Sequence, residues 1–254
     1  MHKKKSSFGN VIEDMFYNRI VKPLMFSSRL GRRTTLGHAD SGINFDHIYL
    51  NKPVGYSGFG RLVDKVLLSL PACKATRERF HTIVKIINKE IQKNKSEGLK
   101  TRIVDLASGP ARYIVEIISE AETNVECLCL DLDRRSLSLG SKLAGQKKPI
   151  LFRRANVLRL GNHLKRFSSN KQWRPNIILA SGFYEYLPDN IVKDHFRNSI
   201  DYIDKGGLFI AILQHKNPNR KLIEKVGVKK DGQKWILNYR SPDVINKWLS
   251  EAGY

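Results

Sequence analysis

The sequence predicts an α/β fold, in which a Rossmann-like, doubly wound and mainly parallel sheet follows a helical N-terminal cap. Two observations predict it. From residue 100 onward, short apolar runs alternate with segments of helical periodicity, as is typical of βαβ units that build a parallel sheet covered on both faces. Small or polar residues directly follow most of these runs, and ligands of such sheets bind beyond the carboxyl ends of the strands.

The first 99 residues are expected to form a basic, helical N-terminal extension. Apolar residues recur at helical spacing over residues 8–26. This predicts an amphipathic helix that packs on a core or a partner, or alternatively lies on a membrane surface. Glycines and prolines over residues 37–60 predict a loop-rich stretch. Helices are then expected at 61–70 and 75–94, with a break at Pro71.

Residues 100–254 are expected to form the second domain. Strands are predicted at 102–107, 125–130, 150–153, 176–180 and 208–213. Helices are predicted between them at 111–121, 134–144 and 189–203. Cys127 and Cys129 alternate with Leu128 in the second run, so we expect both thiols to pack in the core.

Composition narrows the class of protein. No apolar run approaches the roughly 20 residues of a membrane span. The lysines near the N-terminus precede no apolar stretch of the kind found in secretory signals. The three cysteines have neither the number for a disulfide framework nor the spacing of a zinc site. We therefore expect a soluble, cytoplasmic protein without a metal site.

The basic charge predicts an anionic partner. The 254 residues include 45 Lys and Arg against 24 Asp and Glu, a formal net charge of +21. Between Arg134 and Tyr184 the chain has twelve Lys and Arg and no acid. Such a stretch is either a solvated surface or one that attracts nucleic acid, acidic lipid headgroups or a phosphorylated metabolite. Charge alone does not choose among them.

The end of the first strand has the residues of a ligand-binding turn. Ala107, Ser108, Gly109 and Ala111 are small enough for the backbone to approach a ligand closely. The helix that follows offers unpaired N–H groups to a carboxylate, and the carboxylate of Asp105 suits an ammonium group. Together they fit an amino-acid zwitterion better than a pyrophosphate, since neither GxxxxGK[ST] nor a full GxGxxG is present.

The following strand ends supply groups that fit a nucleoside. Asp131 comes where a carboxylate can accept hydrogen bonds from ribose hydroxyls. Asn156 can offer its amide to an adenine edge, with Leu132 or Val157 packed on the ring. Ser181 opens a run of polar and aromatic residues after the fourth strand, where we expect the catalytic edge.

This set resembles the S-adenosylmethionine site of class I methyltransferases, through residues 104–111, Asp131 and the pair 156–157. The loop differs from their usual DxGxGxG pattern because Ala107 and Ala111 replace the first and last glycines. The resemblance implies S-adenosylmethionine as the cofactor, with Asp105, Ser108, Gly109 and Ser181 among its contacts.

A wider resemblance, over residues 40–254, is to a bacterial methyltransferase family whose members are often fused behind an α/β-hydrolase domain. It rests on residues 41–53, 60–64, 181–190 and 235–253. The family implies the fold and the cofactor but no substrate. Class I sheets usually have seven strands, so the last strands are expected to be missing from this chain or to follow Tyr254.

Methyl transfer requires an aligned nucleophile and, for some acceptors, a base. Glu185 is the leading candidate for a base or an ammonium-binding group, with Tyr184 beside it, and His215 is a second candidate base. Each of these residues could instead be structural. The candidates for acceptor binding are Tyr49 and Tyr56, as lid residues, and Tyr186.

We expect a small or amphiphilic, anionic acceptor, one form of which is a lipid-related molecule at the inner membrane surface. One alternative is an RNA methyltransferase that uses the basic 134–184 stretch. Against it, no RNA-binding module and no base-methylation motif is recognisable. The other alternative is a non-catalytic binding or scaffold protein that keeps the fold. The oligomeric state stays open.

Overall fold

The computed structural model describes residues 7–120, 124–145, 149–167 and 173–254. The chain divides into two compact units. The first consists of Met1–Glu78 and Asn217–Ile236, and the second of Arg79–Lys216 and Leu237–Tyr254. This division does not follow the expected border between residues 99 and 100, because helix α6 (Pro71–Ser96) contributes to both units.

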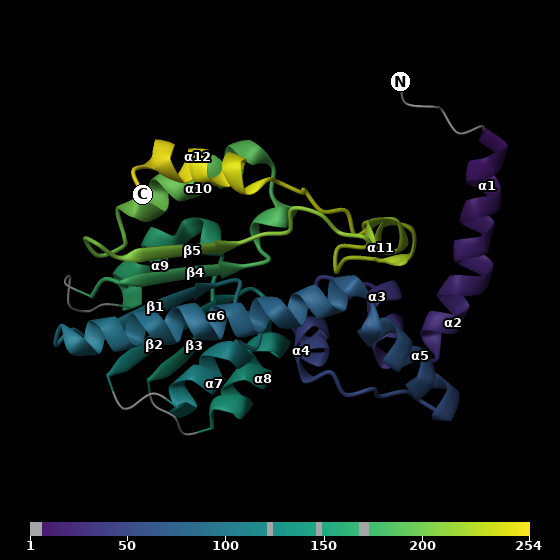
Figure 1. Cartoon of the computed structure of the whole chain (residues 1–254), viewed down its shortest axis with the longest axis horizontal. Helices are drawn as coiled ribbons and strands as arrows, with labels where there is room; N and C mark the ends of the chain where they lie inside the picture. Colours follow the sequence, from purple (N-terminus) through teal and green to yellow (C-terminus); the bar gives the residue numbers. More distant parts are fainter. Residues whose placement is uncertain (1–6, 121–123, 146–148, 168–172) are drawn as a thin grey trace. The chain divides into compact units, whose positions relative to one another are not determined.

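The second unit is built on a parallel sheet of five strands in the order β3-β2-β1-β4-β5 (Figure 1). The strands are β1 (Thr101–Leu106), β2 (Val125–Asp131), β3 (Ile150–Arg154), β4 (Ile177–Ser181) and β5 (Leu208–Ile212). This confirms the predicted α/β class, and every predicted strand end lies within one residue of the observed one. Within the described residues, no antiparallel strand extends the sheet.

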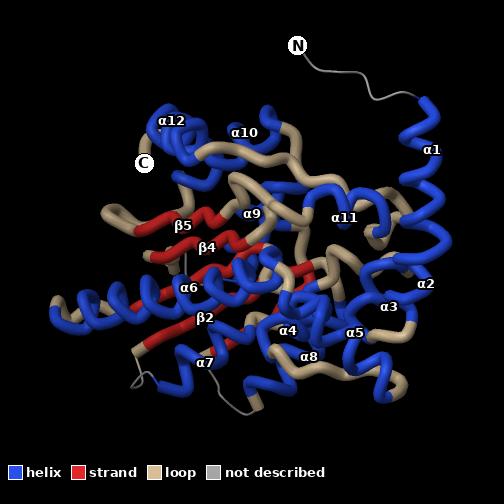
Figure 2. Tube along the Cα trace, turned by 45° about the vertical axis from the view of Figure 1, so that its right-hand side comes forward, coloured by secondary structure: helices blue, strands red, loops and turns tan. Residues whose placement is uncertain are grey.

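Helices cover both faces of this sheet. The helices of the second unit after α6 are α7 (Arg112–Glu120), α8 (Arg134–Ala144), α9 (Leu160–Phe167), α10 (Asp189–Ile200) and α12 (Pro242–Ala252). Val104 and Leu106 share one core with α9, α10 and α12, which lie near β4 and β5 in Figure 2. Asp105 alternates with them and bonds to Tyr113 of α7, so α7 lies on the opposite face.

The first unit consists of short helices around a small core. They are α1 (Ser7–Phe16), a π-helical turn (Tyr17–Val21), α2 (Lys22–Phe26), α3 (Arg29–Thr35), α4 (Gly42–Leu50), α5 (Gly58–Ser69) and α11 (Arg220–Val226). Leu30, Ile48, Leu68 and Cys73 form the buried cluster between them. No helix in the described part of the chain has the length and apolarity needed to cross a membrane.

The carboxylate of Asp64 connects the segments of the first unit. Its Oδ1 accepts hydrogen bonds from Ser28 Oγ at 2.6 Å and from the Leu30 N–H at 3.0 Å. Its Oδ2 accepts one from the Val54 N–H at 2.8 Å and lies 3.0 Å from His47 Nε2. Asp64 is fully buried, so His47 of the motif 41–53 and Asp64 of the motif 60–64 have a structural role in this network.

Three sequence predictions for the first unit are wrong in detail. The loop-rich stretch 37–60 contains α4, because the hydroxyl of Ser41 caps its N-terminus and buried polar side chains such as His47, which lies 3.0 Å from Asp64, hold the helix in place. The predicted break at Pro71 is confirmed, since α5 ends at Ser69, but α6 begins at Pro71 itself rather than at residue 75, because proline is tolerated in the first turn of a helix. The helix predicted at 8–26 is divided by the π-helical turn.

Candidate cofactor and acceptor site

The loop between β1 and α7 has a backbone suited to close ligand approach. Ala107, Gly109 and Ala111 have φ angles of 52°, 56° and 50°. The Ser108 N–H donates to the Leu130 carbonyl at 3.0 Å, which fixes the loop to the neighbouring strand β2. These three residues are those that occupy the glycine positions of DxGxGxG, and all three take the left-handed conformation that this pattern serves.

Asp131 lies at the end of β2 and holds the same loop. Its Oδ2 accepts a hydrogen bond from the Gly109 N–H at 2.7 Å, and its Oδ1 accepts one from the Asp133 N–H at 2.7 Å. A carboxylate offers about four lone-pair sites, so each oxygen retains capacity for a ligand hydroxyl. Burial raises the pKa of Asp131, and the backbone hydrogen bonds partly offset that rise.

The residues expected to contact an adenine come directly after β2 and β3. These strands are neighbours in the sheet, and Asp131 and Arg154 are register partners at their ends, so the residues that follow them lie side by side. Leu132 is 59% exposed and can take a planar ring. Val157 is buried, so it supports the site from below. The Oδ1 of Asn156 accepts the Leu158 N–H at 3.1 Å, so a ligand at this strand end would be bound through the amide nitrogen of Asn156.

Asp105 is wholly buried. Its Oδ1 accepts a hydrogen bond from the Tyr113 hydroxyl at 3.2 Å, whereas its Oδ2 has no partner in the described structure. Burial raises the pKa of Asp105 well above its usual range. Asp105 is the register partner of Leu179, and Ser181 lies two residues further along β4, so Asp105 and Ser181 point to one face of the sheet.

The Ser181 hydroxyl is also buried and unpartnered. Close behind it, Glu185 is 2% exposed, and its Oε1 accepts the Gln214 N–H at 3.0 Å. The second oxygen, Oε2, has no hydrogen-bond partner among the described residues. Burial raises the pKa of Glu185, and the positive charge of Arg79 offsets part of that rise.

Arg79 was not among the site residues predicted from the sequence. An ideal Cβ at Gly182, where φ is +74°, would lie 2.5 Å from Nη1 of Arg79, so the guanidinium lies against this turn. Arg79 comes from α6, next to the buried Phe80 and one helical turn before the buried Ile83. A cation on the apolar stripe of a long helix is the sequence signal that would have identified it.

Tyr184 does not belong to the acceptor site. It is fully buried, and its hydroxyl lies 2.9 Å from Nδ1 of His195. His195 Nε2 in turn lies 3.0 Å from the Val157 carbonyl, and burial lowers the pKa of His195. The prediction of a catalytic role for Tyr184 fails because its ring packs on Phe196 inside the core.

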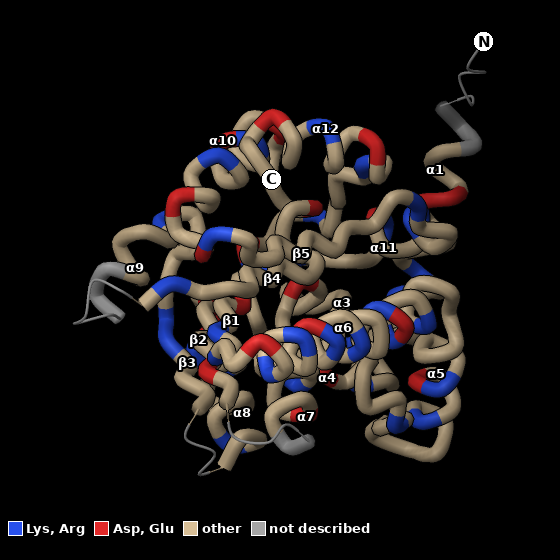
Figure 3. Tube along the Cα trace, turned by 60° about the vertical axis from the view of Figure 1, so that its left-hand side comes forward, with Lys and Arg blue, Asp and Glu red and all other residues tan. Residues whose placement is uncertain are grey.

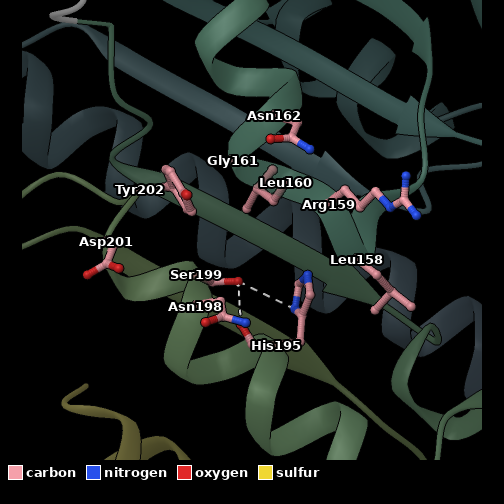
Figure 4. Close-up of a pocket in the computed structure, with 10 residues that line it drawn as sticks. All are labelled: Leu158, Arg159, Leu160, Gly161, Asn162, His195, Asn198, Ser199, Asp201 and Tyr202. Carbon is pink, nitrogen blue, oxygen red and sulfur yellow. Dashed lines mark hydrogen bonds between the residues drawn. The ribbon is translucent and has the colours of Figure 1, made fainter.

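A cavity of about 190 Å³ lies beside this core, between the segment 158–162 and the end of α10 (Figure 4). Its buried polar groups, His195 and Ser199, are hydrogen-bonded to one another and to carbonyl groups. The cavity therefore offers a ligand no unpartnered buried group, in contrast to the strand ends.

The other predicted acceptor residues are more dispersed. Tyr186 is half-buried in the turn beside Glu185. His215 is exposed and directly follows Gln214, whose amide binds Glu185. Tyr49 and Tyr56 belong to the first unit, so their role as a lid stays a prediction. The described residues contain no cluster of three or more His, Cys, Asp or Glu able to hold a metal.

Figure 3 shows Lys and Arg at many positions along the chain rather than in one tail. In the acid-free stretch, Arg134, Arg135, Arg154 and Arg159 are exposed and have no acidic partner among the described residues. Arg154 Nε donates to the Leu132 carbonyl at 3.3 Å. Lys147, Lys148 and Lys171 of this stretch lie outside the described residues.

The chain was compared with known proteins. A family model described as "Putative methyltransferase" matches residues 3–254. The uncharacterized protein YnbC of Escherichia coli (strain K12) is 27% identical over 220 residues, which are 85% of this chain and 37% of YnbC. The chain therefore spans well under half the length of this relative.

Two solved structures share the fold. A possible exported protein from Bordetella parapertussis has a TM-score of 0.69 at 18% identity, over 96% of this chain and 81% of that one. The CMeT domain of the citrinin polyketide synthase has a TM-score of 0.55 at 14% identity, over 100% of this chain and 65% of that one.

Proposed function

This chain belongs to the methyltransferase family whose model it matches, and from that premise we propose that it methylates a small or amphiphilic, anionic acceptor using S-adenosylmethionine. One observation carries the proposal. Three buried oxygen atoms near the ends of β1 and β4 have no partner in the described structure, namely Asp105 Oδ2, Ser181 Oγ and Glu185 Oε2. Buried polar groups are rarely left unpaired, so three such atoms close to the predicted cofactor loop and catalytic edge support the proposal of a ligand site there.

The residues present fit S-adenosylmethionine. The ammonium of its methionine part would lower the raised pKa of Asp105 by pairing with the carboxylate. The first N–H groups of α7 would receive its carboxylate. Asp131 has acceptor capacity left for the ribose hydroxyls, and Leu132 and Asn156 flank the place for the adenine.

When bound, the cofactor supplies an electrophilic methyl group on a sulfonium. The chain then has to hold the acceptor in line with that methyl and exclude water. Arg79 at the Gly182 turn would bind an anionic group of the acceptor. Glu185 Oε2 would take the proton that an O–H or N–H acceptor loses as its new bond to carbon forms and the carbon–sulfur bond breaks.

RNA methylation is a second candidate, favoured by the exposed cations Arg134, Arg135, Arg154 and Arg159 around the proposed adenine site. Phosphate contacts make RNA binding fall steeply with salt. A screen of lipid, RNA and small-molecule extracts with radiolabelled cofactor separates the two candidates. Label in the RNA fraction would contradict the small-acceptor proposal, and label in none of the fractions would favour a non-catalytic binding protein.

Isothermal titration with S-adenosylhomocysteine tests the cofactor site. Asp131→Asn should weaken binding roughly 10- to 100-fold, the worth of hydrogen bonds to a charged group. Asp243→Asn, at an exposed carboxylate of α12, is the matched control and should bind like the wild type. A folded wild-type protein that does not bind, or equal binding by both variants, would contradict the assignment.

Glu185→Gln tests the acceptor end. It keeps the shape and an acceptor for the Gln214 N–H but cannot take a proton, so the rate on an O–H or N–H acceptor should fall about 10²- to 10⁴-fold with unchanged S-adenosylhomocysteine affinity. The wild-type rate should rise with pH as Glu185 loses its proton at its raised pKa. The variant has no carboxyl group there, so its rate should not show this rise. Glu251→Gln, on the exposed side of α12, is the control.

A further inference from the structure

The first unit carries an unusual share of exposed apolar side chains. Of the 19 large apolar residues that are exposed in the described structure, 14 lie in this smaller unit and five in the second. Scattered exposed apolar residues are normal, but contiguous patches mark sites of association. This concentration of exposed apolar side chains therefore indicates that another molecule binds the first unit.

Helix α5 shows the pattern most clearly. Phe59, Leu62 and Val66 recur at i, i+3 and i+7 and are 56%, 59% and 55% exposed. The opposite side of the same helix is buried through Asp64 and Leu68, which hold it to the rest of the unit. The exposed stripe is thus fixed in place and faces away from the core of its own unit.

Helix α2 extends this stripe. It contacts α5, and the Tyr56 N–H donates to the Ser27 carbonyl at 3.3 Å, so the two helices are joined at their ends. Figures 1 and 2 both show α2 and α5 side by side. We use the term apolar face for the exposed residues that they and their flanking turns present: Ile20, Leu24, Phe26, Tyr56, Phe59, Leu62 and Val66.

The charges around the apolar face are positive. From Met15 to Arg77 the chain has ten Lys and Arg and three acids. Asp46 and Asp64 are buried, and Asp40 accepts the Lys230 N–H. In α1, Glu13 and Asp14 pair with Lys221 and Lys225 of α11, so these acids are neutralised within the unit.

The cations that remain at the apolar face are exposed. Arg61 and Lys65 are exposed on α5 next to Leu62 and Val66 in the sequence, with Lys65 at the border of the apolar stripe, and Arg19 and Arg29 come before and after α2. None of the four pairs with an acid among the described residues. Arg32 lies 5.2 Å from the ring of Tyr56. Apolar side chains interleaved with cations are the chemistry of helices that lie in the interface of an anionic membrane.

We propose that the apolar face of the first unit docks on an anionic lipid surface, with Phe59, Leu62 and Val66 inserted between headgroups and Arg61 and Lys65 paired with phosphates. A second copy of the chain is a poorer occupant, because it would bring two cationic rims together without acids to pair with. The proposal goes beyond the methyltransferase assignment and does not depend on it.

Vesicle co-sedimentation tests the docking surface. Wild-type protein should bind vesicles of equimolar phosphatidylglycerol and phosphatidylcholine, bind phosphatidylcholine vesicles far less, and dissociate as salt is raised. Arg61→Gln and Lys65→Gln should each weaken binding roughly fivefold. Phe59→Ser with Leu62→Ser should weaken it at least about tenfold. Leu99→Ser, 50% exposed in the second unit, is the matched control and should bind normally.

Three outcomes would overturn the proposal. They are no vesicle binding by the wild type, equal binding to both kinds of vesicle, and full binding by the Phe59→Ser, Leu62→Ser variant. A solution dimer that this variant dissociates, without vesicle binding, would identify a second copy as the occupant. All variants should bind S-adenosylhomocysteine with the wild-type affinity. A failure of the docking proposal can therefore be told apart from a failure of the cofactor-site assignment.

Discussion

Ala107 and Ala111 hold a backbone conformation that favours glycine. Their φ angles of 52° and 50° cost an L residue about 1–2 kcal/mol. The sequence placed both at the cofactor loop, but it could not show that they keep the glycine conformation. The loop between them is fixed by hydrogen bonds from the Ser108 N–H to the Leu130 carbonyl and from the Gly109 N–H to the Asp131 carboxylate, which compensate for part of this strain.

Ala107→Gly should therefore stabilise the protein by about 0.5–1 kcal/mol, since the relief of strain exceeds the entropy that glycine loses on folding. Ala75→Gly makes the same change at an exposed position within α6 and should destabilise by about 1 kcal/mol. Urea denaturation of the two variants measures both values. A loss of stability in each would show that the loop is not strained.

Asp64 makes the first unit sensitive to acid. Burial alone would raise the pKa of Asp64, but hydrogen bonds from His47, Ser28 and two backbone amides outweigh it and hold the pKa below its usual 3.8. The folded state then binds fewer protons than the unfolded one. The resulting stability is complete above pH 3.8 and is lost as the pH falls through the folded value.

Asp64→Asn should lower the free energy of unfolding at pH 7 by about 2–4 kcal/mol, since it removes the ionised partner of a buried network. It should also make the free energy of unfolding less dependent on pH between the folded pKa of Asp64 and 3.8. Denaturant midpoints across pH 2–6 check both effects. Asp243→Asn, at an exposed carboxylate, should keep the wild-type profile, and an identical profile for Asp64→Asn would contradict the assignment.

At the scale of elements, the sheet was the most predictable part. Its inner strands β1, β2 and β4 are mostly apolar and largely buried, so their pattern is recognisable in the sequence whatever the surface around them. Helix α8 begins at Arg134 and ends at Ala144, as predicted, because Asp133 caps its start and Gly145 follows its end. The short helices α3 and α4 were not predicted, because hydrogen bonds and ion pairs rather than apolar periodicity stabilise them. Ser28 caps α3, the Leu30 N–H of α3 donates to Asp64, and His47 of α4 pairs with the same carboxylate.

The site was predictable where it follows strand ends and unpredictable where distant segments supply it. Asp131, Asn156 and Ser181 were selected because each ends or follows a predicted strand, and the structure places them at or just beyond the ends of β2, β3 and β4. Arg79 and Gln214 reach Glu185 from α6 and from the segment after β5. Their approach depends on how these segments pack, which no local pattern encodes.

The turn that carries Glu185 is held by Arg240, from the segment before α12. Its guanidinium donates to the carbonyls of Tyr184 at 2.7 Å and Leu187 at 2.6 Å and pairs with Asp189 at 2.8 Å. The arginine is 7% exposed, so the carbonyl groups have little access to water as a replacement. Arg240 thereby fixes the position of the proposed base.

Arg240→Ala should destabilise the protein by about 1.5–3 kcal/mol, the worth of charged hydrogen bonds. It should also speed hydrogen exchange at the amides of Tyr186 and Leu187. Arg197→Ala removes an exposed pair with Asp194 on α10 and should cost at most about 1 kcal/mol. Exchange measured by mass spectrometry compares the two, and unchanged exchange in both would show that Arg240 does not hold the turn.

At the scale of the whole molecule, α6 joins the two units through their cores. Cys73 belongs to the buried cluster of the first unit, whereas Phe80, Ile83 and Ile87 are buried in the second. Because the two segments form one continuous helix, loss of the helix in one unit would leave an unsupported helix end in the other. The two units should therefore unfold in one cooperative transition.

S-adenosylhomocysteine at one hundred times its Kd should raise the unfolding free energy by about 2.7 kcal/mol and shift that single transition as a whole. Circular dichroism and tryptophan fluorescence, followed together during thermal unfolding, measure the cooperativity. Two transitions, only one of which moves with the ligand, would show that the units unfold separately.

The shared helix also decides how this protein can be divided for experiments. A fragment that starts at residue 100 would lose α6, and with it the side chains of Ile83 and Ile87, which have no exposed surface in the intact protein. It would also retain residues 217–236 without the first-unit partners that they bind, such as Asp40. Such a truncation would aggregate through its uncovered apolar surface, so a fragment for expression and assay should retain α6 together with the first unit.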